Sequence, residues 1–196
     1  MAAAVERVQP MTAEEFDRFA LADENSERIL EFIDGEIFEV PSNPYASKVS
    51  MRVGILIGVY LLKQPIGHLT GEAGGYRVSG DRYAPDVAFV RREKQDEVAM
   101  EGYNPVPPDL AVEVEFPTSI RSQRRLEKKL ARYAADGTTV WVVYPETREV
   151  EVHAPNQPAQ IVGIDGTLNG GDILPGFTLA VTDIFPEAAD LTAPDA

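Results

Sequence analysis

Apolar positions recur at helical spacing in three stretches of the chain. The first follows a capping-box pair, Thr12 and Glu15, and predicts a short helix. The second gives residues 46–62 a broad apolar face, which predicts a longer helix. The third covers residues 120–135 and stops before Gly137, a residue typical of helix ends.

The remaining pattern is that of strands and turns. Residues 29–40 are β-favouring on both sides of Asp34-Gly35, so they predict a hairpin on a two-residue turn. A second hairpin is expected over residues 138–153, with its turn at Pro145. Further extended segments are expected at residues 68–78, as one strand bent at its glycines, at 85–90, at 109–116 and, as short strands with tight turns, at 161–181.

The strand at residues 109–116 carries two carboxylates where a core strand normally carries aliphatic side chains. Glu113 and Glu115 are two positions apart, so they point to the same face, about 7 Å from each other. Two like charges at that spacing need a cation or hydrogen-bond donors between them. A solvated strand at a sheet edge and a cation site both explain the pattern, and the strand alone does not decide between them.

Composition restricts the chemistry. The 196 residues include no cysteine and two histidines, which excludes thiolate metal sites and makes a histidine-rich zinc centre improbable. Any metal is therefore expected on oxygen ligands, which suit Mg²⁺ or Mn²⁺. The net charge of -14 argues against broad, unselective binding of nucleic acid, although a local basic patch could override it.

Length and hydropathy lead to predictions about domain number, membrane insertion and cellular location. The chain is long enough for one domain with a full core. No apolar run reaches the roughly 18 residues that span a bilayer, and no secretory signal opens the sequence. We therefore expect a cytoplasmic protein that is not inserted in a membrane.

The helix predicted at residues 120–135 is locally basic, in contrast to the whole chain. Five of its basic residues lie on the face opposite the apolar one, where they predict either a nucleic-acid-binding surface or an ordinary solvated face. Lys129 differs, because helical geometry places it at the border between helix and sheet. The five outward residues are Arg121, Arg124, Arg125, Lys128 and Arg132.

Three of these features combine into one hypothesis. Asp86 begins a strand, Glu113 lies in a following strand, and Lys129 points inward from the next helix. Two carboxylates can hold Mg²⁺, and a lysine can orient water or offset charge on a phosphate. The set predicts metal-assisted hydrolysis of a phosphodiester, with Asp86 and Glu113 as metal ligands.

The sequence also resembles the Uma2 family (DUF820) of the PD-(D/E)xK nuclease superfamily. This resemblance implies a restriction-endonuclease-like fold, with a mixed central β-sheet flanked by helices and added hairpins. It also implies that Asp86 and Glu113 match the acidic pair, and that Lys129 matches a lysine moved from the strand to the helix. The resemblance is carried by residues 32–37, Pro85-Asp86 with the following strand, residues 108–114, residues 129–133 with Gly137, residues 140–143 and residues 174–177.

The chain departs from the family pattern in two places. Glu115-Phe116 stands where family members tend to have an apolar residue and then serine, so a third carboxylate occupies the position of the superfamily lysine. Glu115 could act as a general base or form an ion pair with Lys129. A histidine that often follows the first hairpin is also absent, with residues 43–48 in its region.

The working hypothesis is a Mg²⁺- or Mn²⁺-dependent endonuclease that acts on nucleic acid, with DNA as the expected substrate. The alternatives are a catalytically silent binding protein of the same fold and a metal-dependent enzyme on another phosphorylated substrate. The resemblance makes a homodimer the expected assembly, with the residue 140–152 hairpin or the charged loop after residue 90 as contact surfaces. The expected layout is an N-terminal extension at 1–11, one domain at 12–186 and a disordered tail at 187–196.

Overall fold

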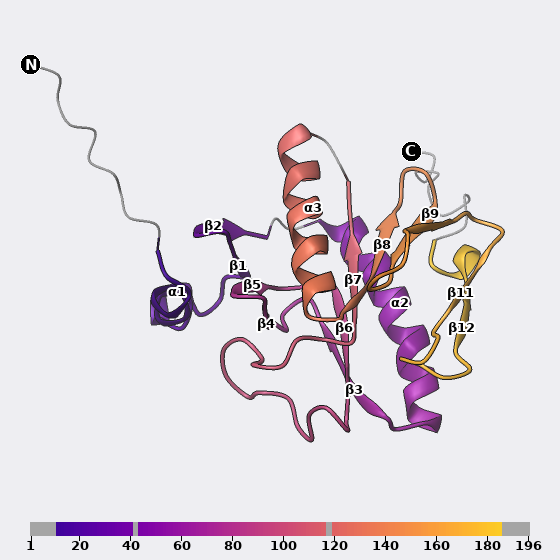
Figure 1. Ribbon diagram of the computed structural model, residues 1–196, viewed down its shortest axis with the longest axis horizontal. Coiled ribbons are helices and arrows are strands. Elements are labelled where there is room, and N and C mark those ends of the chain that lie inside the picture. The colour runs from indigo at the N-terminus through magenta and orange to yellow at the C-terminus, as the bar shows by residue number, and fades with distance from the viewer. Residues whose placement is uncertain (1–10, 41–42, 117–118, 186–196) are drawn as a thin grey trace, which may run out of the picture.

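A computed structural model describes residues 11–40, 43–116 and 119–185 (Figure 1). The main element is a six-stranded mixed sheet whose strand order is β10-β9-β8-β7-β6-β3. All neighbouring strands are antiparallel except β7 and β8, which are parallel. The strand bounds are β3 Gly67–Gly71, β6 Val87–Arg91, β7 Leu110–Val114, β8 Thr139–Tyr144, β9 Glu149–His153 and β10 Gln160–Val162.

Strand β7, which carries Glu113, lies in the middle of this sheet and is buried along its whole length. Of the two alternatives for this strand, the solvated sheet edge is therefore wrong. Because side chains alternate along a strand, Val112 and Val114 enter the core on one face, whereas Ala111 and Glu113 point to the other. The two faces of β7 thus meet different helices.

Helices α2 (Pro44–Lys63) and α3 (Ile120–Ala135) cover opposite faces of the sheet (Figure 1). Val49, Val53 and Ile57 of α2 are fully buried against the Val112 face. The predicted bounds of α3 agree with the structure: Ser119 caps its first turn, and Gly137 follows its end with a φ of 78°. As the crossover between two parallel strands, α3 is held over the Glu113 face.

A second, four-stranded sheet with the order β2-β1-β5-β4 lies beside the main one. The predicted first hairpin is confirmed, since β1 and β2 pair around Asp34 and Gly35, which both have positive φ. Helix α1 (Ala13–Ala20), with the expected capping box, packs Phe16 against the Phe32 ring. The strand bounds are β1 Leu30–Ile33, β2 Glu36–Glu39, β4 Tyr76–Val78 and β5 Asp81–Tyr83.

The segment expected to form one bent strand at residues 68–78 is instead two strands in different sheets. β3 pairs with β6 in the main sheet, and β4 pairs with β5 in the second sheet. Strand β5 itself was not expected, because Asp81-Arg82-Tyr83 has no apolar alternation. The glycines that suggested a bend mark the crossing between the two sheets.

Among the described residues, helix α2 is long enough and apolar enough to cross a membrane, judged by its length and composition alone. Lys48 and Arg52 interrupt its apolar residues, so the helix does not contain the unbroken apolar run of roughly 18 residues that the sequence was expected to lack. The same composition is typical of a core helix, and three of its residues are fully buried against the sheet.

The C-terminal part of the domain consists of short strands and tight turns, as expected. β11 (Thr167–Asn169) and β12 (Thr178–Ala180) form a two-stranded sheet, followed by a single 3₁₀ turn. Leu168, Leu179 and Ile184 join the core on the α2 side. The proposed extension at residues 1–11 and the tail at 187–196 lie outside the described residues, except for Met11.

Candidate active site

Asp86 stands directly before β6 and is half-buried. Its Oδ2 accepts a hydrogen bond from the backbone N–H of Val114 at 2.6 Å, which fixes the carboxylate beside β7. Burial raises the pKa of Asp86 to about 6, against the opposing effects of the Val114 N–H and of Lys129. Within the described part of the chain, Oδ1 of Asp86 has no hydrogen-bond partner, so one oxygen of this carboxylate is open to a ligand.

Glu113 is buried under α3, with only 5% of its surface exposed. Its Oε1 accepts a hydrogen bond from the Tyr133 hydroxyl at 3.0 Å, and its Oε2 accepts one from Lys129 Nζ at 2.8 Å. Burial raises the pKa of Glu113, and the nearby Glu31 and Asp86 act in the same direction against Lys129. The negative charge of Glu113 and the nearby carboxylates therefore exceeds the positive charge that Lys129 supplies.

Lys129 points into the protein, as helical geometry predicts, and is 4% exposed. Its Nζ donates to Glu113 and also to Oε1 of Glu31 at 2.9 Å, and it lies 5.4 Å from the centre of the Tyr83 ring. Burial opposes its charge, but the two carboxylates outweigh that effect and raise the pKa of Lys129. The ion pair with Lys129, one of the two alternatives for Glu115, is not formed among the described residues, where Lys129 pairs with Glu31 and Glu113.

Glu31 is the site residue that sequence reasoning missed. It lies in β1 with 5% exposure, and its Oε1 also accepts a hydrogen bond from the Ala84 N–H at 3.1 Å. Leu30 and Phe32 on either side of it point toward α1, so strand alternation turns Glu31 toward α3. The signal that could have found it is the one that identified Glu113, namely an acid within an apolar strand.

The four side chains Glu31, Asp86, Glu113 and Lys129 line one cavity of about 240 Å³. Five carboxylates line it, against two cations, Lys129 and Arg125. No cluster of three or more His, Asp or Glu side chains in the described ranges is arranged as a ready-made metal site. The acidic excess nevertheless favours a bound cation, and the available donors are carboxylate oxygens, which suit Mg²⁺ or Mn²⁺.

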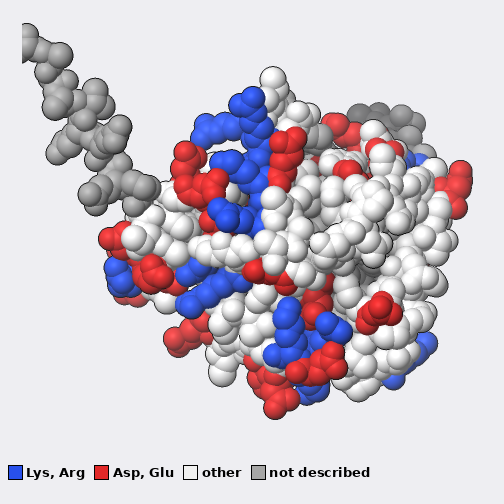
Figure 2. Space-filling model, viewed as in Figure 1, with Lys and Arg blue, Asp and Glu red and all other residues white. Residues whose placement is uncertain are grey.

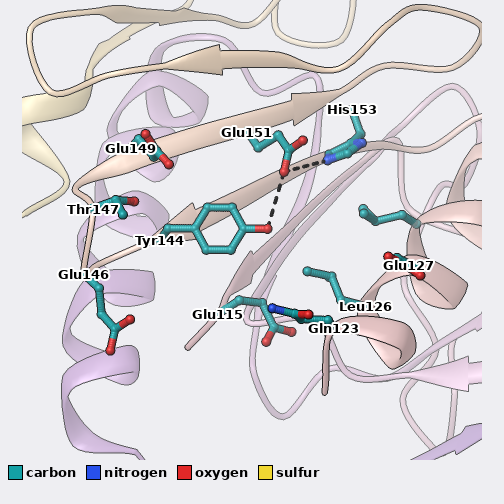
Figure 3. Close-up of a pocket in the computed structure, with 11 residues that line it drawn as sticks. Glu115, Gln123, Leu126, Glu127, Tyr144, Glu146, Thr147, Glu149, Glu151 and His153 are labelled. Atoms are coloured by element: carbon teal, nitrogen blue, oxygen red, sulfur yellow. Dashed lines mark hydrogen bonds and ion pairs between the residues drawn. The ribbon is translucent and has the colours of Figure 1, made fainter. Parts of the chain in front are cut away.

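Glu115 lies at the boundary between this cavity and a larger pocket of about 500 Å³ on the other side of α3. Figure 3 draws Glu115 among the residues that line the large pocket. In the same pocket, Tyr144 and His153 both approach the Glu151 carboxylate at 3.4 Å. Five glutamates line the large pocket, so its charge disfavours phosphate. Burial raises the pKa of Glu115, a change that suits a residue accepting a proton.

The predicted nucleic-acid-binding residues do not form one free basic surface. Figure 2 shows Lys and Arg side chains gathered over α3 with acidic side chains beside them. Asp34, at the tip of the first hairpin, pairs with Lys128 at 2.6 Å and with Arg132 at 2.9 Å. Arg121 lies 3.8 Å from Glu36 of the same hairpin. The hairpin thus neutralises much of the charge that the sequence suggested was free.

Arg125 and Arg124 differ from the other three basic residues. Arg125 is half-buried, lines the cavity and lies one helical turn before Lys129, with its guanidinium 5.2 Å from the centre of the Phe38 ring. Arg124 is exposed, and no ion pair joins it to another residue of the described ranges. Arg125, which the sequence predicted to lie on the outer face of the helix, therefore reaches the candidate active site.

Comparisons with known proteins agree with the fold. Residues 13–182 match the sequence model of Uma2, described as "Putative restriction endonuclease". The crystal structure of a "putative nuclease belonging to DUF820" from Anabaena variabilis ATCC 29413 is similar in fold, with a TM-score of 0.72 and 19% sequence identity. The similarity covers 89% of this chain and 97% of that chain. No curated protein matches the chain.

Proposed function

Because the chain belongs to the Uma2 family of restriction-endonuclease-like proteins, we propose that it is a divalent-metal-dependent endonuclease that hydrolyses phosphodiester bonds in DNA. The observation that carries this proposal is the meeting of Asp86, Glu113 and Lys129 at one cavity. Carboxylates that converge on a cavity beside a lysine are what metal-assisted phosphodiester hydrolysis requires.

The donor set fits Mg²⁺ or Mn²⁺. Asp86 and Glu113 would hold the ion, because both carboxylates line the cavity and burial makes their negative charges costly without a counter-ion. When bound, the ion would lower the pKa of water and offset charge on the phosphate. Glu31 stands on the other side of Lys129 and completes the acidic surroundings.

The chain's own residues supply the remaining functions. Lys129 holds the Glu113 carboxylate in place and provides positive charge next to the scissile phosphate. Glu115 accepts a proton from the attacking water, since its carboxyl group lies at the cavity wall with a raised pKa. Arg125 contacts a phosphate oxygen from the rim, where its guanidinium rests on Phe38. Cutting both strands of a duplex needs two such sites, so a homodimer is part of the proposal.

The test is incubation of supercoiled plasmid with the protein in Mg²⁺, in Mn²⁺ and in a metal chelator. Metal-dependent conversion to nicked and linear DNA is the expected result. Absence of cleavage at every metal concentration contradicts the endonuclease proposal. Hydrolysis of bis(p-nitrophenyl) phosphate without any cleavage of DNA would instead favour a different phosphorylated substrate, and single-stranded RNA is included to distinguish RNA from DNA.

A further inference from the structure

Four large apolar side chains form an exposed stripe on α2. Met51, Ile55, Val59 and Leu62 are 61%, 55%, 49% and 86% exposed, and they lie at successive turns of the helix. Half of the eight large apolar residues that are exposed in the described ranges belong to this stripe. A stripe of this kind on the outside of a core helix is unusual for a surface that meets only water.

The stripe lies beside an open sheet edge. β3 is the last strand of the main sheet and pairs only with β6 among the described residues, so the backbone groups of its other edge are available. α2 and β3 touch where Gly58 approaches the Leu69 side chain. Met51 and Ile55 line a groove of about 480 Å³ with residues 69–74, and Asp86 lies at its end. One surface therefore contains an apolar stripe, a strand edge and one wall of the candidate active site.

We propose that this surface, formed by the α2 stripe and the β3 edge, binds a second copy of the chain in a two-fold dimer. Its area suits that partner: a 20-residue helix is about 30 Å long, and with the strand beside it the surface offers on the order of 500 Å² per copy. The total of roughly 1,000 Å² meets the lower limit of a specific interface. An antiparallel strand edge is also self-complementary under a two-fold axis.

Charge favours a second copy over an anionic membrane. α2 contains no Asp or Glu, so contact along it adds no acid–acid repulsion to that expected between two chains of net charge -14. The same net charge repels an anionic bilayer. Arg52, one of three basic residues on α2, donates through Nε to the Asp183 carbonyl at 3.1 Å, so this donor is not free for a lipid headgroup.

The α2 surface is an alternative to the two contact surfaces expected from the sequence, the residue 140–152 hairpin and the charged loop after residue 90. In the residue 140–152 hairpin, β8 lies between β7 and β9, and β9 pairs with β10, so neither strand presents an open edge. Trp141 and Val150 are buried in the core. The interface stands on exposed area and strand pairing, and it deepens the homodimer of the proposed function. A dimer that cuts no DNA would support the interface and contradict only the endonuclease activity.

The experiment is sedimentation velocity over a wide concentration range, with the parent chain, Ile55→Lys, Val59→Lys and the control Ile161→Lys. Ile161 is 68% exposed on β10, away from α2, so it adds the same charge at an unrelated apolar position. Far-ultraviolet circular dichroism and the melting temperature verify that each variant is folded. Lysine is a good helix former, so the two α2 variants are expected to keep the helix.

The parent and Ile161→Lys are expected to sediment at twice the 21.5 kDa mass of the chain, and the two α2 variants to dissociate at least tenfold more readily. A parent that is monomeric at every concentration overturns the proposal. So does a dimer that Ile55→Lys and Val59→Lys leave unchanged. Binding of the parent to phosphatidylcholine–phosphatidylglycerol vesicles, with loss of that binding in Ile55→Lys and no dimer, would assign the stripe to a membrane instead.

Discussion

The ammonium group of Lys129 joins two carboxylates that come from different sheets, at 2.9 Å from Oε1 of Glu31 and 2.8 Å from Oε2 of Glu113. β1 brings Glu31 from the N-terminal sheet and β7 brings Glu113 from the main sheet. The contact therefore fixes the two sheets relative to α3 as well as placing charge at the cavity.

Replacing Lys129 with methionine is expected to lower the free energy of unfolding by about 3–5 kcal/mol, because it leaves two buried carboxylates without a cation. Urea denaturation measures the change, and Lys128→Met is the control. Lys128 is 56% exposed and pairs only with the tip of the hairpin, so its loss should change stability little. Adding Glu31→Gln and Glu113→Gln to Lys129→Met should recover part of the loss. Equal small effects of the two lysine variants would contradict the structural role given to Lys129.

The raised pKa of Asp86 predicts a pH dependence of metal binding. Burial moves the pKa of this carboxyl from 3.8 to about 6, so Asp86 binds a proton as the pH falls through 6. Because a metal needs the ionised carboxylate, the Asp86 proton should weaken Mn²⁺ binding by about tenfold for each pH unit below 6. Isothermal titration calorimetry from pH 5 to 7.5 measures this. Affinity that does not change below pH 6 would contradict the assignment of Asp86.

The raised pKa of Asp86 also predicts how the stability of the metal-free protein changes with pH. The folded chain binds the Asp86 proton more tightly than the unfolded chain, whose carboxyl titrates near 3.8. Its contribution is thus unfavourable above about pH 6 and is relieved as the pH falls toward 4. The parent should gain stability relative to Asp86→Asn over that window, as followed by urea denaturation at each pH. A constant difference between the two proteins would show that Asp86 does not titrate as described.

Arg125→Ala is expected to weaken binding of a DNA duplex and to reduce its salt dependence by about one counter-ion, since one phosphate contact is lost. Fluorescence anisotropy in an Asp86→Asn background measures binding without cleavage. Arg124→Ala is the matched control, because Arg124 is the neighbouring exposed arginine on the same helix. If Arg124→Ala reduces the salt dependence of binding as much as Arg125→Ala does, the phosphate contact assigned to Arg125 at the cavity is contradicted.

Asp34→Asn is expected to strengthen binding of the same duplex at low salt. The substitution removes the carboxylate that holds Lys128 and Arg132, and asparagine tolerates the positive φ of 51° at this position. Asp165→Asn changes the net charge equally at an exposed distant site and serves as the control. Equal binding by the two variants would show that releasing Lys128 from Asp34, and Arg132 from one of its two carboxylate partners, has no effect on DNA binding.

Local signals in the sequence were sufficient for most of the elements. The capped helices, the Asp34-Gly35 hairpin and the β7–α3–β8 unit depend on neighbouring residues, and each lies where its pattern predicts it. The mixed sheet flanked by helices, which the family resemblance implied, is confirmed by the similar crystal structure. Asp86, Glu113 and Lys129 were singled out because acids at apolar strands and a lysine at a helix border are local anomalies. The structure brings them to one cavity, and their catalytic and metal-binding roles stay predictions.

Long-range relationships were not predictable in the same way. Glu31 and Lys129 meet across 98 residues, and no local pattern indicates that contact. The same holds for the crossing between β3 and β4, which depends on strand pairing in two different sheets. The pairing of Asp34 with Lys128 and Arg132 was also hidden, because net charge along a helix does not reveal which acids fold against it.

Plasmid cleavage in Mn²⁺ tests directly whether Asp86 and Glu113 hold a catalytic metal. The proteins compared are the parent, Asp86→Asn and Glu113→Gln, with Asp165→Asn as a control for the lost charge. Each variant is first verified to be folded by circular dichroism. We expect cleavage by the parent and by Asp165→Asn, and a loss of about 100-fold or more in both site variants, because each removes a carboxylate proposed to bind the metal. Cleavage by Asp86→Asn and Glu113→Gln at the rate of the parent would contradict this proposal.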